Sequence, residues 1–166
     1  SVCYPVSSMS CHVSACPNHQ TQRTTPFATR GAVASLGATG YELDLTKLSK
    51  EEKTQVREQI ANYKQIDELV LKGDLYRLSD PFCTNYFCEM LVGKDKSKAY
   101  VVGERFRGDP CDHDRVLKLR GLDEGKTYTV KELNITASGA ALMGAGLFYP
   151  RLPDCGSWIW HIEEVR

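Results

Sequence analysis

One short stretch near the start of the sequence gathers side chains that can do chemistry. It holds the histidines His12 and His19, the cysteines Cys11 and Cys16, and Arg23. Thiolates and imidazoles together are typical zinc ligands. The spacing disfavours zinc, because Cys11 and His12 are adjacent and would point to opposite faces of a strand. We therefore expect no metal at this site.

The same residues permit a second chemistry, in which a cysteine thiolate attacks a substrate. Cys16 would be the nucleophile, and His12 or His19 would be its base. The alternative is that Cys11 and Cys16 are small apolar residues in a core. No oxyanion-hole signature lies nearby in the sequence, which favours the alternative.

The local pattern also places this stretch at a strand end. Residues 11–15 predict a short strand, which Pro17 and Asn18 end. The polar residues Asn18, His19 and Arg23 then follow the carboxyl end of that strand. In parallel α/β architectures ligands gather at this rim. A loop that satisfies its own backbone polar groups is the competing interpretation.

Carboxylates and aromatic side chains near the C-terminal end offer a third chemistry. Glycoside hydrolysis needs two carboxyl groups held across a sugar, and aromatic rings can stack on sugars. An exposed turn or an occasional cation site explains the acids more simply, and alternation along a strand favours a core position for the aromatics. The residues concerned are Asp109, Asp112, His113 and Asp114, then Glu163 and Glu164, and the aromatic residues Phe148, Tyr149, Trp158 and Trp160.

Predicted elements divide the chain into two parts. Ser49 and Glu52 form a capping box ahead of an apolar stripe that runs to Gly73, which predicts a long amphipathic helix. Before it, residues 31–37 form an apolar run between glycines and predict a buried strand, with a turn at 37–40. After Pro81 the period changes to two. Expected strands there are 87–92 with 98–106, 115–119 with 127–130, and 157–165, with a turn or short helix at 138–146; together they indicate an antiparallel sandwich.

Composition narrows the class of protein. Lysine plus arginine and aspartate plus glutamate both number 21, so no overall charge would attract nucleic acid or an anionic membrane. The sequence has no apolar run long enough to cross a bilayer and no signal peptide. Seven cysteines, an odd number, fit free thiols in the cytoplasm better than a disulfide framework. The chain does not begin with methionine, which we interpret as the mark of a fragment.

The motifs resemble those of the α-galactosidases of glycoside hydrolase family 36. Residues 9–23 are similar to the family pattern M-G-x-H-V-S-x-x-P-N-H-Q-T-x-R, and residues 40–48 read G-Y-E-L-D-L-T-K-L. The similarity continues through residues 73–78 and 143–147 and covers almost the whole chain. Two positions depart from the pattern: Ser10 stands where the family usually has Gly, and Gln22 stands where Gly is common.

The resemblance implies an α/β fragment followed by an all-β domain. Residues 1–78 would supply the last two strands, at 11–15 and 31–36, and the final helix of a (β/α)8 barrel. Residues 79–166 would form the C-terminal antiparallel β-sandwich. The family nucleophile and acid/base motifs have no counterpart here, so both catalytic aspartates would lie upstream of Ser1, and no catalytic residue is carried over.

The implied activity is that of a retaining enzyme that removes terminal α-linked galactose, with no cofactor. His12, Asn18, His19 and Arg23 are then expected to line or support the barrel mouth. The implied partners are α-galactoside oligosaccharides, the rest of the enzyme chain and further copies of the enzyme, as a tetramer. A non-catalytic module that binds carbohydrate, or merely packs on a neighbour, remains the alternative.

Overall fold

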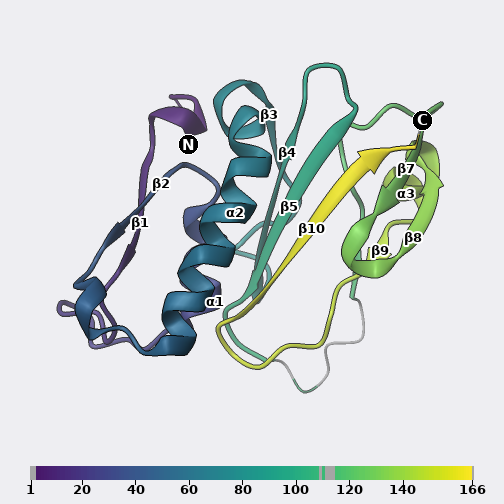
Figure 1. Cartoon of the computed structure of the whole chain (residues 1–166). Helices are drawn as coiled ribbons and strands as arrows, with labels where there is room; N and C mark the ends of the chain where they lie inside the picture. The colour runs from purple at the N-terminus through teal and green to yellow at the C-terminus, as the bar shows by residue number, and fades with distance from the viewer. Residues whose placement is uncertain (1–2, 109, 111–114, 166) are drawn as a thin grey trace.

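The protein is largely one antiparallel sheet with a few helices on its two faces (Figure 1). The computed structural model describes residues 3–108, 110 and 115–165. The helices are α1 (Phe27–Ala34), α2 (Lys50–Lys72) and α3 (Gly139–Gly144), with single 3-10 turns η1 (Val6–Ser8), η2 (Leu45–Lys47) and η3 (Lys131–Leu133). The strands are β1 (Ser10–Ser14), β2 (Ala38–Glu42), β3 (Asp74–Arg77), β4 (Tyr86–Val92), β5 (Lys98–Arg105), β6 (Val116–Leu117), β7 (Thr127–Val130), β8 (Ile135–Ser138), β9 (Leu147–Phe148) and β10 (Gly156–Glu164).

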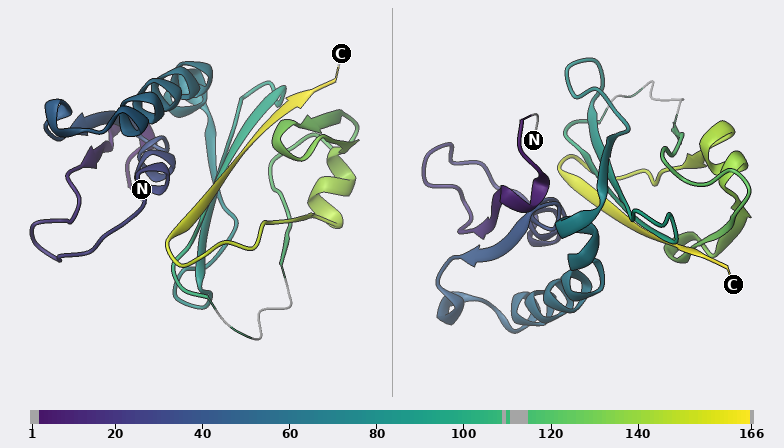
Figure 2. Two further views of the ribbon diagram at one scale, coloured as in Figure 1. Left: turned by 60° about the horizontal axis from the view of Figure 1, so that its bottom comes forward. Right: turned by 90° about the horizontal axis from the view of Figure 1, so that it is seen from above.

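The main sheet has six strands in the order β3-β4-β5-β10-β7-β8, all paired antiparallel. Alternation along β10 sends Trp158, Trp160 and Ile162 to one face, where they are buried with the side chains of the pair β6–β9 and of α3. The opposite face carries Tyr100 and Val102 and is covered by α2 and α1 (Figure 2). Each face therefore has its own core.

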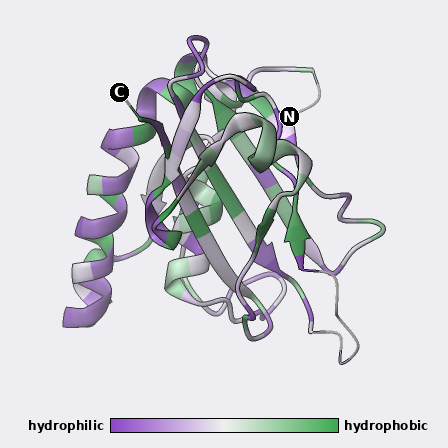
Figure 3. Cartoon of the chain, turned by 90° about the vertical axis from the view of Figure 1, so that its right-hand side faces the viewer, coloured by the Kyte–Doolittle hydropathy of each residue, from purple (hydrophilic) through white to green (hydrophobic). Residues whose placement is uncertain are grey.

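Helix α2 is amphipathic, as its sequence predicts. The Ser49 side chain accepts from the Glu52 backbone N–H, and the Glu52 carboxylate accepts from the Ser49 N–H, which confirms the capping box. The buried residues Ile66, Leu69 and Val70 face the sheet. Most of the other residues of the long helix are hydrophilic (Figure 3), although Ile60 and Leu71 are also exposed. Helix α2 thus joins the sheet to the N-terminal elements.

The N-terminal elements are a parallel strand pair and its helices. Strand β1 pairs with β2 so that His12 lies opposite Gly40. Val13 packs with Phe27 and Ala34 of α1 and with Tyr41 and Val56. Both carboxyl ends, at Ser14 and Glu42, lie at the same edge of this two-stranded sheet. A strand–helix–strand–helix order is typical of a parallel α/β architecture.

Three predictions about the elements are wrong. The apolar run at 31–36 is mostly the second half of α1, because Phe27, Gly31 and Ala34 recur at helical spacing and are buried. The second parallel strand is β2, in the place of the expected turn at 37–40. The expected pair 115–119 with 127–130 is also wrong, since β6 pairs with β9 and β7 pairs with β8 and β10. The strands at 11–15, 87–92, 98–106 and 157–165 are confirmed to within a few residues.

Candidate functional site

The loop after β1 is built around Asn18. Its side-chain Oδ1 accepts hydrogen bonds from the backbone N–H groups of Gln20 and Thr21, both at 3.0 Å. The Asn18 N–H donates to the Arg23 carbonyl at 2.9 Å, which closes the loop. Asn18 therefore shapes the loop that follows the strand, and its side-chain oxygen accepts hydrogen bonds from within that loop. His19 is exposed on this loop.

His12 lies on β1 itself, on the side away from the helices. Its Nε2 is 3.0 Å from Ser10 Oγ, and its Nδ1 is 3.5 Å from Glu42 Oε2. The neighbouring Cys11 packs against the cluster of Val13 and Phe27 instead. Cys11 and His12 thus point to opposite sides, as the adjacent positions predict.

Arg23 is exposed, and its positive charge acts on the carboxyl group of Glu104 of β5. Burial raises the pKa of the Glu104 carboxyl, and the positive charge of Arg23 partly opposes that rise. Glu104 also lines a cavity of about 330 Å³ between β1, α1 and β5, together with His12 and Arg30. Arg30 holds the loop in place, because its guanidinium donates to the carbonyls of Ser14 and Thr25. These bonds tie both ends of the loop to α1.

The thiols are engaged in packing and weak hydrogen bonds. Burial raises the pKa of Cys11, which disfavours the reactive thiolate. Cys16 Sγ donates to the Thr25 carbonyl at 3.7 Å. Both ring nitrogens of His12 already contact Ser10 and Glu42. The structure therefore gives no support to a Cys16–His12 nucleophile pair.

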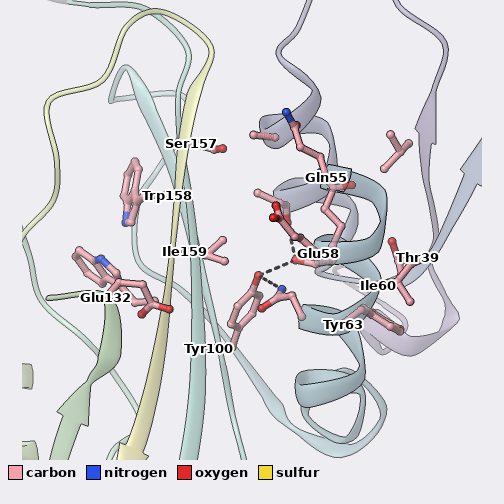
Figure 4. Close-up of a pocket in the computed structure, with 18 of the residues that line it drawn as sticks. Thr39, Gln55, Glu58, Ile60, Tyr63, Tyr100, Glu132, Ser157, Trp158 and Ile159 are labelled. Atoms are coloured by element: carbon pink, nitrogen blue, oxygen red, sulfur yellow. Dashed lines mark hydrogen bonds between the residues drawn. The ribbon is translucent and has the colours of Figure 1, made fainter. Parts of the chain in front are cut away.

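A larger groove, of about 870 Å³, lies between α2 and the strand β10 (Figure 4). Gln55, Glu58 and Tyr63 face it from the helix, and Ser157 and Ile159 face it from the sheet. At its floor the Tyr100 hydroxyl is bonded to Ser35 at 3.1 Å and to Asn62 at 3.0 Å. The groove combines apolar and amide side chains, and the sequence pattern gave no sign of it.

The acids and aromatics near the C-terminus have structural roles. Glu163 pairs with Lys131 at 2.8 Å, and Glu164 pairs with Lys126 at 3.0 Å. Trp158 and Trp160 are 7% and 1% exposed and belong to the sheet core. Tyr149 stacks on Trp158, whereas Phe148 is 68% exposed. The acidic group at Asp109 and 112–114 lies outside the described residues.

Two carboxylates of this region escaped sequence analysis. Glu42 lies at the end of β2, inside the motif at residues 40–48, but the strand was placed elsewhere. Glu104 ends an alternating strand and gave no signal of its approach to Arg23. Correct placement of strand β2 would have revealed Glu42. The position of Glu104 relative to Arg23 depends instead on how two separate parts of the chain pack.

Known families match both parts of the chain. Residues 1–73 match Melibiase, and residues 86–162 match the glycosyl hydrolase family 36 C-terminal domain. The chain is 41% identical over 167 aligned residues to alpha-galactosidase AgaA of Geobacillus stearothermophilus. It is 44% identical over 147 residues to the bifunctional alpha-galactosidase/sucrose kinase AgaSK of Mediterraneibacter gnavus. The alignments cover 100% and 89% of this chain, but only 23% and 16% of those proteins.

Solved structures agree with these matches. The galactosidase domain of AgaSK superposes with a TM-score of 0.93 at 40% identity, over 98% of this chain and 23% of that one. A variant of the Geobacillus stearothermophilus AgaA in complex with raffinose gives the same values. The matched fold and domains are those of proteins described as alpha-galactosidases. The chain belongs to glycoside hydrolase family 36, and it corresponds to a C-terminal part of the family members it matches.

Proposed function

We propose that the chain is the C-terminal portion of a retaining α-galactosidase that hydrolyses terminal α-D-galactosyl residues of oligosaccharides. The observation that carries the proposal is the 41% identity to an alpha-galactosidase across the whole chain. Complexes of AgaA variants with raffinose and with stachyose support oligosaccharides as the substrate class. A retaining mechanism needs a nucleophile and an acid/base held about 5–5.5 Å apart, and we place both upstream of Ser1.

We also propose a division of labour within the chain. Residues 1–78 would be the end of the catalytic (β/α)8 barrel, with β1, β2 and α2 as its last strands and helix. Residues 79–166 would be the C-terminal sandwich. Strand β3, at the end of the first part, hydrogen bonds to β4 of the second, so the two parts would be firmly joined. His12, Asn18, His19 and Arg23 would line or support the barrel mouth.

The same proposal covers the partners, the oligomeric state and the cellular location of the full-length enzyme. These 166 residues would need the rest of the enzyme chain as a partner, and the complete enzyme would form a homotetramer. The described cysteines Cys3, Cys11, Cys16, Cys83, Cys88 and Cys155 are free, which supports a cytoplasmic location. Within the described residues, no helix is both long and apolar enough to cross a membrane.

A chromogenic α-galactoside tests the catalytic assignment. The full-length protein is expected to release nitrophenol from p-nitrophenyl α-galactoside, and the 166-residue chain is expected to release none. Turnover by the short chain would mean that the catalytic carboxyl groups lie within it. An inactive full-length protein, shown to be folded by circular dichroism, would contradict the hydrolase assignment itself.

The alternative is a non-catalytic module that binds carbohydrate or packs on a neighbour. The groove between α2 and β10 favours it, since aromatic, amide and carboxylate side chains line it together. The burial of Trp158 and Trp160 argues against sugar stacking on the indoles. Calorimetric titration of the 166-residue chain with raffinose separates the two, because only a binding module would give heat of binding.

A further inference from the structure

A polar group of three residues lies on the uncovered side of the parallel pair β1–β2. Val13 and Tyr41 pack against the helices. Because side chains alternate along a strand, Ser10 and His12 of β1 point the other way, as does Glu42 at the end of β2. In a barrel that has its helices outside, this side of the strands faces the interior. The three residues would therefore face the barrel interior, with Glu42 at the mouth, His12 in the middle of its strand and Ser10 at the far end.

Their contacts form a connected series. Ser10 Oγ lies 3.0 Å from His12 Nε2, and His12 Nδ1 lies 3.5 Å from Glu42 Oε2. The imidazole is thus fixed at both nitrogens, from its own strand and from the next one. The contact with the imidazole favours a position of the Glu42 carboxylate above the strand pair.

Gly40 makes this crossing possible. It is the register partner of His12 on β2. A Cβ atom at Gly40 would lie 3.2 Å from His12 Cδ2, closer than most carbon contacts. The missing side chain leaves space for the ring to extend across β2 toward Glu42.

Glu42 is oriented but not covered. Its side chain is 75% exposed, and that of His12 is 44% exposed. Glu42 also ends its strand, at the edge where the carboxyl ends of β1 and β2 lie together. In (β/α)8 barrels the residues that contact substrate come from this edge. A carboxylate there can accept hydrogen bonds from the hydroxyl groups of a sugar.

We propose that Glu42 contacts hydroxyl groups of the galactosyl substrate and that His12, held by Ser10, positions its carboxylate. The inference rests on the proposed function, since it places β1 and β2 in the catalytic barrel. Glu42 is the substrate-contacting group, and His12 is a positioning residue. Glu42 binds substrate, and neither residue takes part in bond cleavage.

Kinetics of the full-length enzyme with p-nitrophenyl α-galactoside test the proposal. Glu42→Gln removes a charge-assisted hydrogen bond and is expected to raise KM about 10- to 100-fold, with kcat changed less than threefold. Glu68→Gln is the matched control, because Glu68 is a similarly exposed carboxylate, paired with Lys72 on α2. It is expected to leave KM within twofold of the wild-type value.

A second variant separates positioning from a general structural effect. His12→Gln is expected to raise KM by a smaller factor than Glu42→Gln, and to add nothing further in the Glu42→Gln background. An equal effect of His12→Gln in both backgrounds would overturn the positioning role. An active wild-type enzyme with an unchanged KM in Glu42→Gln would overturn the inference while leaving the proposed function intact. An inactive wild-type enzyme would count against the proposed function instead.

Discussion

Gly31 of α1 lies directly against the side-chain amide of Gln59 of α2. A Cβ atom on Gly31 would be 2.1 Å from Gln59 Cδ. The amide is held there by two hydrogen bonds: Nε2 donates to the Phe27 carbonyl at 3.2 Å, and Oε1 accepts from the Tyr41 hydroxyl at 2.8 Å. One side chain thus connects β2, α1 and α2, and the glycine provides the space for it.

Gly31→Ala should therefore destabilise this part of the protein. The flexible Gln59 side chain must move away and give up its two hydrogen bonds, each of which contributes about 0.5–1.5 kcal/mol. Alanine is intrinsically better than glycine in a helix by about 1 kcal/mol, which offsets part of the loss. Urea unfolding monitored by α-helical circular dichroism should show a net loss of about 1 kcal/mol.

A double-mutant cycle with Gln59→Ala identifies the cause. In the Gln59→Ala background the added methyl group has space, so Gly31→Ala should become neutral or stabilising. An unchanged penalty in that background would show that the methyl group clashes with something other than the amide.

The same residue shows why the N-terminal part was harder to predict from sequence than the rest. Gly31 and its apolar neighbours are equally compatible with a buried strand and a buried helix, because an unbroken apolar run carries no periodicity. The capping box at Ser49 and the alternation of Trp158 and Trp160 are local signals, and both predictions are confirmed. The pairing of β6 with β9 depends on long-range packing, which no local pattern encodes.

The residues of the candidate site also fall into two groups: those that a local sequence signal indicates, and those that only the folded structure brings together. The motif indicated His12 and Asn18, and the structure shows that Asn18 shapes the loop while His12 contacts Glu42. Glu42 went unnoticed because its strand was placed several residues too early. The approach of Arg23 to Glu104 joins residues far apart in the sequence and lies beyond any local pattern.

Gln22→Gly is expected to stabilise the loop after β1. Gln22 has φ 56°, in the left-handed region that favours glycine. The substitution relieves about 1 kcal/mol of backbone strain and loses one exposed hydrogen bond, from Gln22 Nε2 to the His19 carbonyl. Resistance of the loop to limited proteolysis should increase. Gln22→Ala, which loses the same bond but keeps the Cβ atom, should show no gain; equal protection in both variants would contradict the strain argument.

Arg23→Gln should destabilise the protein at neutral pH but not in acid. A carboxyl whose pKa is raised on folding adds stability below its unfolded-state pKa, and that stability is lost as the pH rises through the folded-state value. Burial already raises the pKa of Glu104, and removing the Arg23 charge raises it further. The deficit should therefore be present at pH 7, stay below about 1 kcal/mol because both groups are partly solvated, and disappear near pH 3.

Thermal unfolding at the two pH values checks this difference. Arg57→Gln, on the exposed side of α2, is the control for the loss of one positive charge. A deficit of the same size at both pH values would show that Arg23 acts through packing and not through the charge of Glu104.

Hydrogen exchange should reveal that β1 and β2 depend on chain outside these 166 residues. The two strands pair only with each other in the described structure, so each has an open edge, whereas β5 pairs with β4 and β10 and the end of β10 pairs with β5 and β7. Backbone amides at open edges are poorly protected. In the isolated chain, mass spectrometry should find fast exchange in residues 10–14 and 38–42 and slow exchange in residues 98–105 and 162–164. In the full-length protein the first two segments should become protected, since a closed barrel removes its edges. Equal protection of residues 10–14 and 38–42 in both proteins would mean that the parallel pair is stable without the rest of a barrel.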